Sequence, residues 1–188
     1  ELNVSLGYAN YDTVNATLYG TAGLSSNVAA DIAVFYTNQG KGWGKNLNIG
    51  GDVNIRDEIA VRSKIFIEAS DTLKFTISGD YSHRESDVGN VRYVLPGAVL
   101  IGGTTYSGTI YDSKGDLPRD AKFDHYGLSL KAALDLGWAS LTSTTAYGNS
   151  YNFGLFDQDA GPVKVIDALF TERSSDFQQE FLLNGKSG

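Results

Sequence analysis

The clearest structural signal in this chain is the stretch Ile59-Ala60-Val61-Arg62-Ser63-Lys64-Ile65-Phe66-Ile67-Glu68. Aliphatic residues at positions 59, 61, 65 and 67 alternate with a second set that carries Arg62, Lys64 and Glu68. A period of two residues is typical of a β-strand whose two faces meet different surroundings. One face of this strand is therefore predicted to be apolar, and the other must contact water.

The same alternation recurs along the whole chain. It predicts strands over residues 2–9, 14–24, 28–37, 59–68, 74–84, 125–134, 138–153 and 171–183. Most of these segments are longer than the five or six residues usual in soluble sheets, and a tilted strand of about 9 to 11 residues crosses a bilayer. The sequence thus predicts an all-β, antiparallel up-and-down segment of a transmembrane β-barrel with about eight strands.

The connections between these strands are sorted by length. Short turns are predicted at residues 24–27, 69–72 and 135–137, whereas the alternate connections run over residues 40–55, 88–120 and 154–170. Outer-membrane β-barrels have tight periplasmic turns, long external loops and aromatic girdles at both interfaces. Aromatic residues gather near the strand ends in this chain, at Tyr8, Tyr11, Tyr36, Tyr81, Tyr126, Tyr147 and Tyr151 on the long-loop side and at Phe75 and Trp138 on the other.

Two other protein classes give the same alternation. A small, self-contained eight-stranded outer-membrane barrel with an adhesin or structural role can close around its own side chains. A soluble β-sandwich carbohydrate-binding module packs one face of each sheet into a core and exposes the other. The sorted connections and the strand lengths favour a membrane protein over the sandwich.

Composition excludes several kinds of function. The formal net charge of -7 argues against nucleic acid as a partner, because such binding needs a basic surface. The absence of cysteine excludes disulfides, thiolate zinc sites and cysteine nucleophiles. The run His83-Arg84-Glu85 resembles the His-x-Glu of zinc deaminases, but that site also needs cysteine ligands. We predict no catalytic site, no metal site and no cofactor, and hence no enzyme.

The long connections are the candidate ligand-binding elements, since loops of more than about 12 to 15 residues are often functional. Segment 88–120 combines tyrosines with arginines, which suits stacking and charge-assisted hydrogen bonds to a ligand. Segment 40–55 adds a tryptophan. The predicted ligand-contact residues are Trp43, Arg92, Tyr93, Tyr106, Tyr111 and Arg119.

Two turn motifs and one strand resemble those of TonB-dependent outer-membrane receptors. Leu6-Gly7-Tyr8-Ala9-Asn10-Tyr11-Asp12-Thr13 is similar to the family's "G-Y-G-N-Y-D-T" turn, with Ala9 in place of the second glycine. Gly23-Leu24-Ser25-Ser26-Asn27-Val28-Ala29-Ala30 is similar to "G-x-L-S-D-x-L-A-A-R", with Asp31 where arginine is common. Ser174-Ser175-Asp176-Phe177-Gln178-Gln179-Glu180-Phe181-Leu182-Leu183 resembles "S-Q-E-x-R-L", with Leu182 replacing the arginine.

This resemblance implies a 22-stranded barrel in the bacterial outer membrane that imports an iron chelate, cobalamin or an oligosaccharide. Residues 1–188 would form the N-terminal third of the barrel, and the plug domain and the C-terminal strands would be absent from them. The implied partners are TonB, acting through the plug, the plug itself against the inner barrel face, outer-membrane lipid and the small-molecule ligand. Siderophore uptake by such a receptor is the expected kind of transport.

Overall fold

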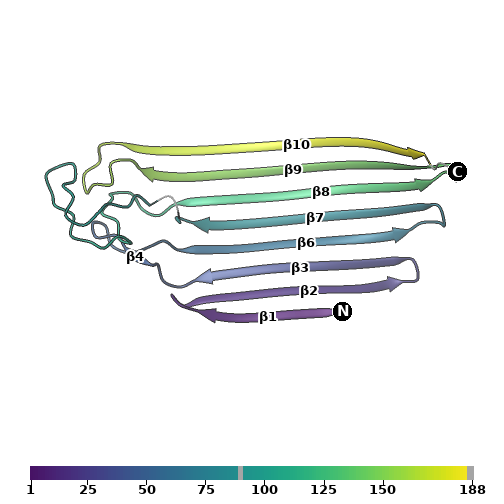
Figure 1. Cartoon of the computed structure of the whole chain (residues 1–188), viewed down its shortest axis with the longest axis horizontal. Helices are drawn as coiled ribbons and strands as arrows, with labels where there is room; N and C mark the ends of the chain where they lie inside the picture. The colour runs from purple at the N-terminus through teal and green to yellow at the C-terminus, as the bar shows by residue number, and fades with distance from the viewer. Residues whose placement is uncertain (89–90, 186–188) are drawn as a thin grey trace.

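The structure, a computed structural model, describes residues 1–88 and 91–185 (Figure 1). Eight long strands dominate it, and two short strands form a separate hairpin. The long strands are β1 (Leu2–Ala9), β2 (Thr13–Ser25), β3 (Val28–Gln39), β6 (Arg56–Glu68), β7 (Leu73–Ser86), β8 (Ala121–Asp135), β9 (Ala139–Asp157) and β10 (Asp167–Gly185), and the short ones are β4 (Gly44–Lys45) and β5 (Asp52–Val53). Among the described residues, no helix has the length and apolar character needed to span a membrane.

The long strands form one sheet in the order β1-β2-β3-β6-β7-β8-β9-β10. Each strand is antiparallel to its neighbours along the chain, apart from the β4–β5 hairpin that is inserted between β3 and β6. The predicted antiparallel up-and-down sheet of eight strands is therefore confirmed. The sheet is open in the described part of the chain, because β1 does not pair with β10 and no second long-stranded sheet packs on it.

Several predicted strand boundaries are wrong. β8 begins at Ala121 and not at residue 125, because its ladder with β9 continues to the pair Ala121 and Gly154. β9 and β10 extend well beyond residues 138–153 and 171–183, because their ladder continues to the pair Asp157 and Asp167. The connection between them is therefore residues 158–166 and is shorter than the predicted 154–170. β6 likewise begins at Arg56 and not at residue 59, because its polar residues Arg56, Asp57 and Glu58 still pair with β7.

The ladders set the faces of the sheet. Ala30, Ile65, Ile77 and Leu130 are successive partners across β3, β6, β7 and β8, so they share one face. The next row along the strands contains Asp31, Lys64, Ser78 and Ser129 and lies on the other face. We call these the apolar face and the polar face. The two-residue alternation in the sequence therefore gives the sheet one apolar face and one polar face.

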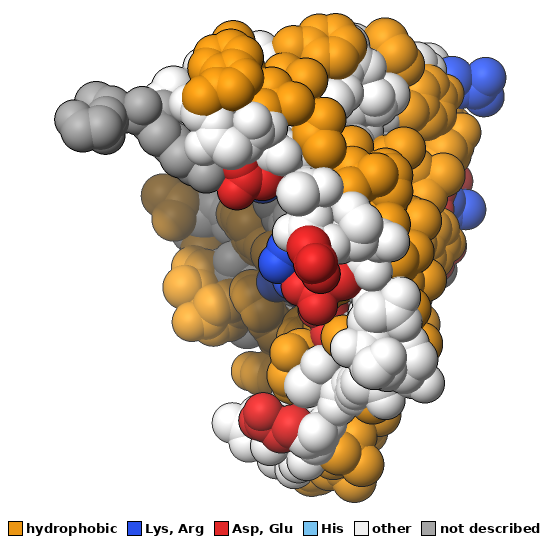
Figure 2. All heavy atoms as spheres, turned by 90° about the vertical axis from the view of Figure 1, so that its right-hand side faces the viewer, with side chains coloured by type: hydrophobic (Ala, Val, Ile, Leu, Met, Phe, Trp, Pro, Cys, Tyr) orange, Lys and Arg blue, Asp and Glu red, His pale blue; other side chains and the backbone are white. Residues whose placement is uncertain are grey.

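The apolar face is not a protein core. Leu128 is 62% exposed and Phe177 is 71% exposed, although both lie within long strands. Seen from the short-turn end, hydrophobic side chains form a continuous surface on the right-hand side of the molecule (Figure 2). No other layer of the described residues covers this surface, and exposed apolar surfaces of this extent are typical of sites that contact another protein or a membrane.

The polar face holds charges that pair across strands. The Lys64 ammonium lies 3.3 Å from the Asp31 carboxylate, and the Lys74 ammonium lies 2.7 Å from Glu68. Such exposed pairs contribute little stability. They show instead that this face is built for an aqueous or polar environment.

Most buried side chains lie at one end of the sheet. Val53, Ile55, Leu100 and Tyr106 all belong to the long connections, which gather at the left of Figure 1. The predicted tight turns, β2–β3, β6–β7 and β8–β9, lie at the opposite end, whereas the short β1–β2 turn lies on the side of the long connections. The packed loops at this end, which we call the loop end, are the part of the molecule that resembles a binding site.

Candidate functional site

Asp87 joins the long connections to one another. Its side chain is 3% exposed, and its carboxylate accepts hydrogen bonds from the backbone amides of Asn54 (2.9 Å) and Ile55 (2.7 Å). Asn54 is fully buried and has a positive φ of 65°. Its side-chain amide donates to the carbonyl of Tyr111 at 3.2 Å, and Tyr93 donates its hydroxyl proton to the Asn54 side-chain oxygen. Segment 40–55 is thereby fixed against segment 91–120.

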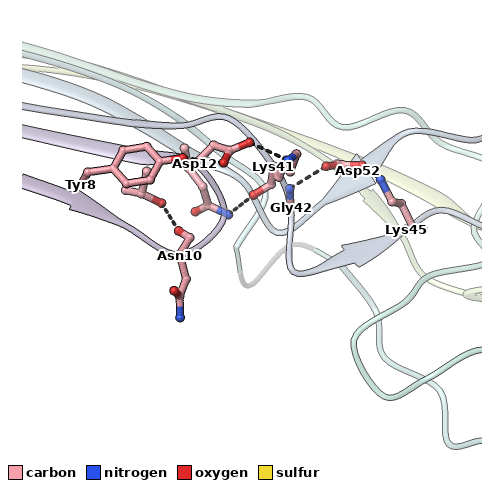
Figure 3. Close-up of polar contacts among 9 residues, drawn as sticks. Tyr8, Asn10, Asp12, Lys41, Gly42, Lys45 and Asp52 are labelled. Carbon is pink, nitrogen blue, oxygen red and sulfur yellow. Dashed lines mark hydrogen bonds and ion pairs between the residues drawn. The ribbon is translucent and has the colours of Figure 1, made fainter.

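A second set of contacts ties the β1–β2 turn to segment 40–55 (Figure 3). The Asp12 carboxylate accepts a hydrogen bond from Tyr8 at 2.6 Å and lies 2.7 Å from the Lys41 ammonium. Lys41, and secondarily Tyr8, lower the pKa of Asp12. Asp52 then accepts from the amide of Gly42 at 2.8 Å and pairs with Lys45. These contacts hold the β4–β5 hairpin in place.

Gly44 allows the two longest connections to touch. A Cβ added to this residue would lie 1.8 Å from the carbonyl oxygen of Tyr111, so no other residue fits without a shift of the backbone. The Lys45 amide beside it donates to the Asp112 carboxylate at 2.7 Å. Close packing of backbone on backbone makes the loop end a defined surface.

Five of the six predicted ligand-contact residues are exposed, namely Trp43, Arg92, Tyr93, Tyr111 and Arg119, and Tyr106 is buried. Trp43, Tyr93 and Tyr111 are the aromatic residues among the exposed five. Residues 89 and 90 of the predicted segment lie outside the described residues. Ligand contact by the three aromatic residues stays a prediction, and their exposure makes them available for it.

Tyr106 and Arg92 both contact other residues of the loop end, Tyr106 as a buried side chain and Arg92 as an exposed one. Tyr106 is 1% exposed, and its hydroxyl donates to the carbonyl oxygens of Thr109 (2.7 Å) and Asp112 (2.8 Å). Burial, and then the charge of Asp112, raise the pKa of Tyr106. The Arg92 guanidinium lies 5.0 Å from the ring centre of Phe156 and donates to Gln158. Both side chains support the loops in this conformation.

A basic and aromatic hollow opens where the polar face meets the loop end. It has a volume of about 370 Å³, and its walls include Arg56, Arg84, Phe123, Asn152 and Phe170. The ladder positions Arg84 opposite Phe123, and Phe123 opposite Asn152. Arg119, one of the predicted residues, lines an adjoining hollow with Ser86 and Ala121, which border both.

Sequence reasoning missed most of this hollow. It placed Arg84 on a polar strand face but did not bring it beside Phe123. Phe123 precedes the predicted strand 125–134, so its place on the polar face was not predicted, and the register between β7 and β8 had to be known to align it with Arg84. We call the group Arg56, Arg84, Phe123, Asn152 and Phe170 the basic hollow.

Three carboxylates converge at the start of β10. Oxygen atoms of Asp116, Asp157 and Asp167 all lie within 4.8 Å of one another, and Asp157 is the direct ladder partner of Asp167. The Lys164 ammonium lies 2.7 Å from one Asp167 oxygen. Carboxylates in this arrangement are the ligands that hard cations such as Ca²⁺ prefer, so these are the described residues that could hold a metal. These three aspartates are far apart in the sequence, so no local motif marks them. The sequence therefore predicts no metal site, a prediction that misses this group.

Two histidine–aspartate pairs lie on neighbouring strands but on opposite faces. His83 Nδ1 lies 2.6 Å from Asp124 on the apolar face, and His125 Nε2 lies 3.1 Å from Asp80 on the polar face. The backbone of the sheet separates them, so the pairs cannot act on one substrate. Each histidine thus has an aspartate partner on the neighbouring strand.

Comparisons of the chain with protein-family models, with curated proteins and with solved structures found no match. The site must therefore be interpreted from its own geometry.

Proposed function

We propose that this chain is part of the wall of a bacterial outer-membrane β-barrel that imports a scarce nutrient, of the TonB-dependent receptor class. The apolar face would contact lipid, and the polar face would contact a plug domain and the water of the lumen. The loop end would lie outside the cell and receive the ligand, an iron chelate, cobalamin or an oligosaccharide. TonB would act through the plug.

The observation that carries this proposal is the exposed apolar face of a single-layered sheet. A soluble protein covers such a surface with a second layer, because burying apolar area contributes about 25 cal/mol per Å². The surface in this structure runs through β1 to β10 and has no covering layer among the described residues. Lipid is the medium that suits a surface of this extent.

The height of the apolar band supports the same proposal. Tyr81 and Tyr126 are ladder partners near the loop end, and Leu73 and Leu134 are partners near the tight turns. Eight residue steps along a strand span about 27 Å, or about 20 Å across a bilayer at a tilt near 40°. Trp138 is exposed and lies in the β8–β9 turn, beyond the Leu73–Leu134 pair. A band between two rows of aromatic residues is typical of a barrel in a membrane.

The two unpaired edge strands of the sheet, β1 and β10, are also consistent with a barrel wall that contains further strands. β1 and β10 each offer an unpaired row of backbone hydrogen-bonding groups, which is unfavourable in lipid. Further strands on both sides would satisfy these groups. A 22-stranded barrel would also leave the polar face beside a plug and water rather than beside its own opposite wall.

Site-directed spin labelling tests this proposal directly, because residues 1–188 contain no cysteine that would compete for the label. Single cysteines at Ile65 and Ile77 on the apolar face, and at Lys64 and Ser78 on the polar face, would be spin-labelled in the intact protein in liposomes. We expect labels at Ile65 and Ile77 to be accessible to oxygen, which partitions into lipid. Labels at Lys64 and Ser78 should be accessible to a water-soluble nickel chelate instead.

The comparison between adjacent residues is its own control, because each pair differs only in the face that it occupies. Equal access of the nickel chelate to all four labels would exclude lipid contact. Access to neither reagent at Ile65 and Ile77 would mean that a protein layer covers the apolar face, and the proposed function would then be wrong.

A further inference from the structure

Arg84 is an unpaired cation in the basic hollow. Its direct partner across the ladder is Glu58, but that carboxylate pairs with Arg56. No carboxylate in the described part of the chain forms an ion pair with Arg84. Lys64 and Lys74, on the same face, both have acidic partners. The charge of Arg84 is thus left for something else to neutralise.

Phe123 determines how Arg84 is presented. The guanidinium carbon lies 5.5 Å from the centre of the Phe123 ring, which holds the planar group by a cation–π contact. No described residue accepts a hydrogen bond from the Arg84 guanidinium, so its N–H donors are available to a ligand. A guanidinium held in this way can donate two parallel hydrogen bonds to a carboxylate or phosphate group.

The surroundings reinforce a positive potential. Lys122 also lines the basic hollow, and none of the described Asp or Glu side chains lines it. In the adjoining hollow, Arg119 lies on a wall that also contains Glu85 and Asp120. Asn152 adds an uncharged hydrogen-bonding group, and Phe170 adds an aromatic wall. The wall of the basic hollow is therefore locally rich in positive charge, although the formal net charge of the chain is -7.

We propose that the basic hollow binds the anionic group of a small-molecule ligand, with Arg84 as the principal contact and Phe123 as the residue that positions it. The ligand class is a carboxylate- or phosphate-bearing compound whose apolar part lies against Phe170. A volume of about 370 Å³ is within the range of small-molecule sites. This inference rests on the proposed function and selects anionic over neutral substrates for the imported nutrient.

Calorimetric titration of the intact protein in detergent micelles tests this inference. The probes are citrate and pyrophosphate as small anions and maltose as a neutral compound. The variant is Arg84→Gln, and the matched control is Arg62→Gln, which removes an arginine from the same face but outside the hollow.

We expect saturable binding of at least one anion and weaker binding of maltose. Loss of charge-assisted hydrogen bonds predicts that Arg84→Gln weakens anion binding by about 10-fold or more. Arg62→Gln should change it by less than about 2-fold. Anion affinity should also fall as the salt concentration rises.

Three results would overturn the inference: no saturable binding of either anion, equal weakening by both variants, or maltose binding as tight as anion binding. Unchanged anion binding in Arg84→Gln would also overturn it. If the urea midpoint of that variant were also lower than that of Arg62→Gln, Arg84 would have a structural role and would pair with an acidic group elsewhere in the protein. The spin-label experiment is independent of binding, so it separates failure of this inference from failure of the proposed function.

Discussion

Replacing Ile77 by arginine would test the lipid-facing assignment energetically. Ile77 lies four residues from Tyr81 and four from Leu73, which mark the two ends of the apolar band on β7. Four residues correspond to about 14 Å along the strand and about 10 Å across the bilayer at a tilt near 40°. Ile77 is therefore near the midplane, where an outward-facing arginine costs about 2 to 4 kcal/mol.

The measurement is the free energy of unfolding in phospholipid vesicles, obtained from urea titrations of the intact protein. Trp43 and Trp138 provide the fluorescence signal. Ser78→Arg is the matched control, because Ser78 is the next residue and lies on the polar face opposite Lys64 and Ser129. We expect it to cost less than about 1 kcal/mol, since the Lys64 charge is already paired with Asp31.

Depth provides a second control. Tyr81→Arg lies near the interface on the same face, and the expected cost there is about 0 to 1 kcal/mol. Equal costs at Ile77, Ser78 and Tyr81 would refute the reasoning. A larger cost at Ser78 than at Ile77 would reverse the assignment of the faces.

Three further perturbations test the loop end. Asp87→Ala should leave the buried amides of Asn54 and Ile55 without an acceptor and destabilise segment 40–55 by about 2 to 4 kcal/mol, measured as faster amide exchange there; unchanged exchange, or the same change in the exposed-turn control Asp71→Ala, would contradict this. Gly44→Ala should cost about 1 to 3 kcal/mol and expose segment 91–120 to protease, because its Cβ would lie 1.8 Å from the Tyr111 carbonyl oxygen, whereas Gly7→Ala, with its nearest neighbour at 3.8 Å, should have little effect. The amide of Ile166, followed by those of Gly161 and Val165, lowers the pKa of Asp159, so its stabilising effect is present above the pKa of an ordinary aspartate and is lost as the pH falls through the lowered value. Amide protection at Val165 and Ile166 should therefore fall as the pH drops below the pKa of an ordinary aspartate, and a profile that Asp159→Asn leaves unchanged would rule this out.

The sequence predicted the faces of the sheet because a period of two residues survives folding unchanged. Ile65 was expected on the apolar face, and its ladder partners Ala30 and Ile77 lie there with it. Strand ends were harder to predict. Arg56, Asp57 and Glu58 extend β6 through backbone pairing with β7, and no apolar side chain among them marks a face.

The loop end was only partly predictable, because composition identifies residue types but not their burial. Tyr106 and Tyr111 looked equivalent in the sequence, yet one is buried and the other is exposed. The proximity of Arg84 to Phe123, and of Asp157 to Asp167, depends on ladder register over connections of different lengths. Such pairings are long-range contacts, which local patterns do not encode.

The nearest-neighbour order of the strands has a consequence for how the sheet assembles. β2–β3, β6–β7 and β8–β9 are hairpins with tight turns, so each can form from local contacts before it pairs with its neighbours. Closing the connection 87–120 costs about 2 kcal/mol more chain entropy than closing a four-residue turn. Association of β7 with β8 should therefore follow formation of the separate hairpins. The Asp87 contacts to Asn54 and Ile55 continue the β6–β7 ladder beyond its Arg56–Ser86 pair, so they would form with that hairpin. The contact of Lys45 with Asp112, which lies in the long connection, would form later.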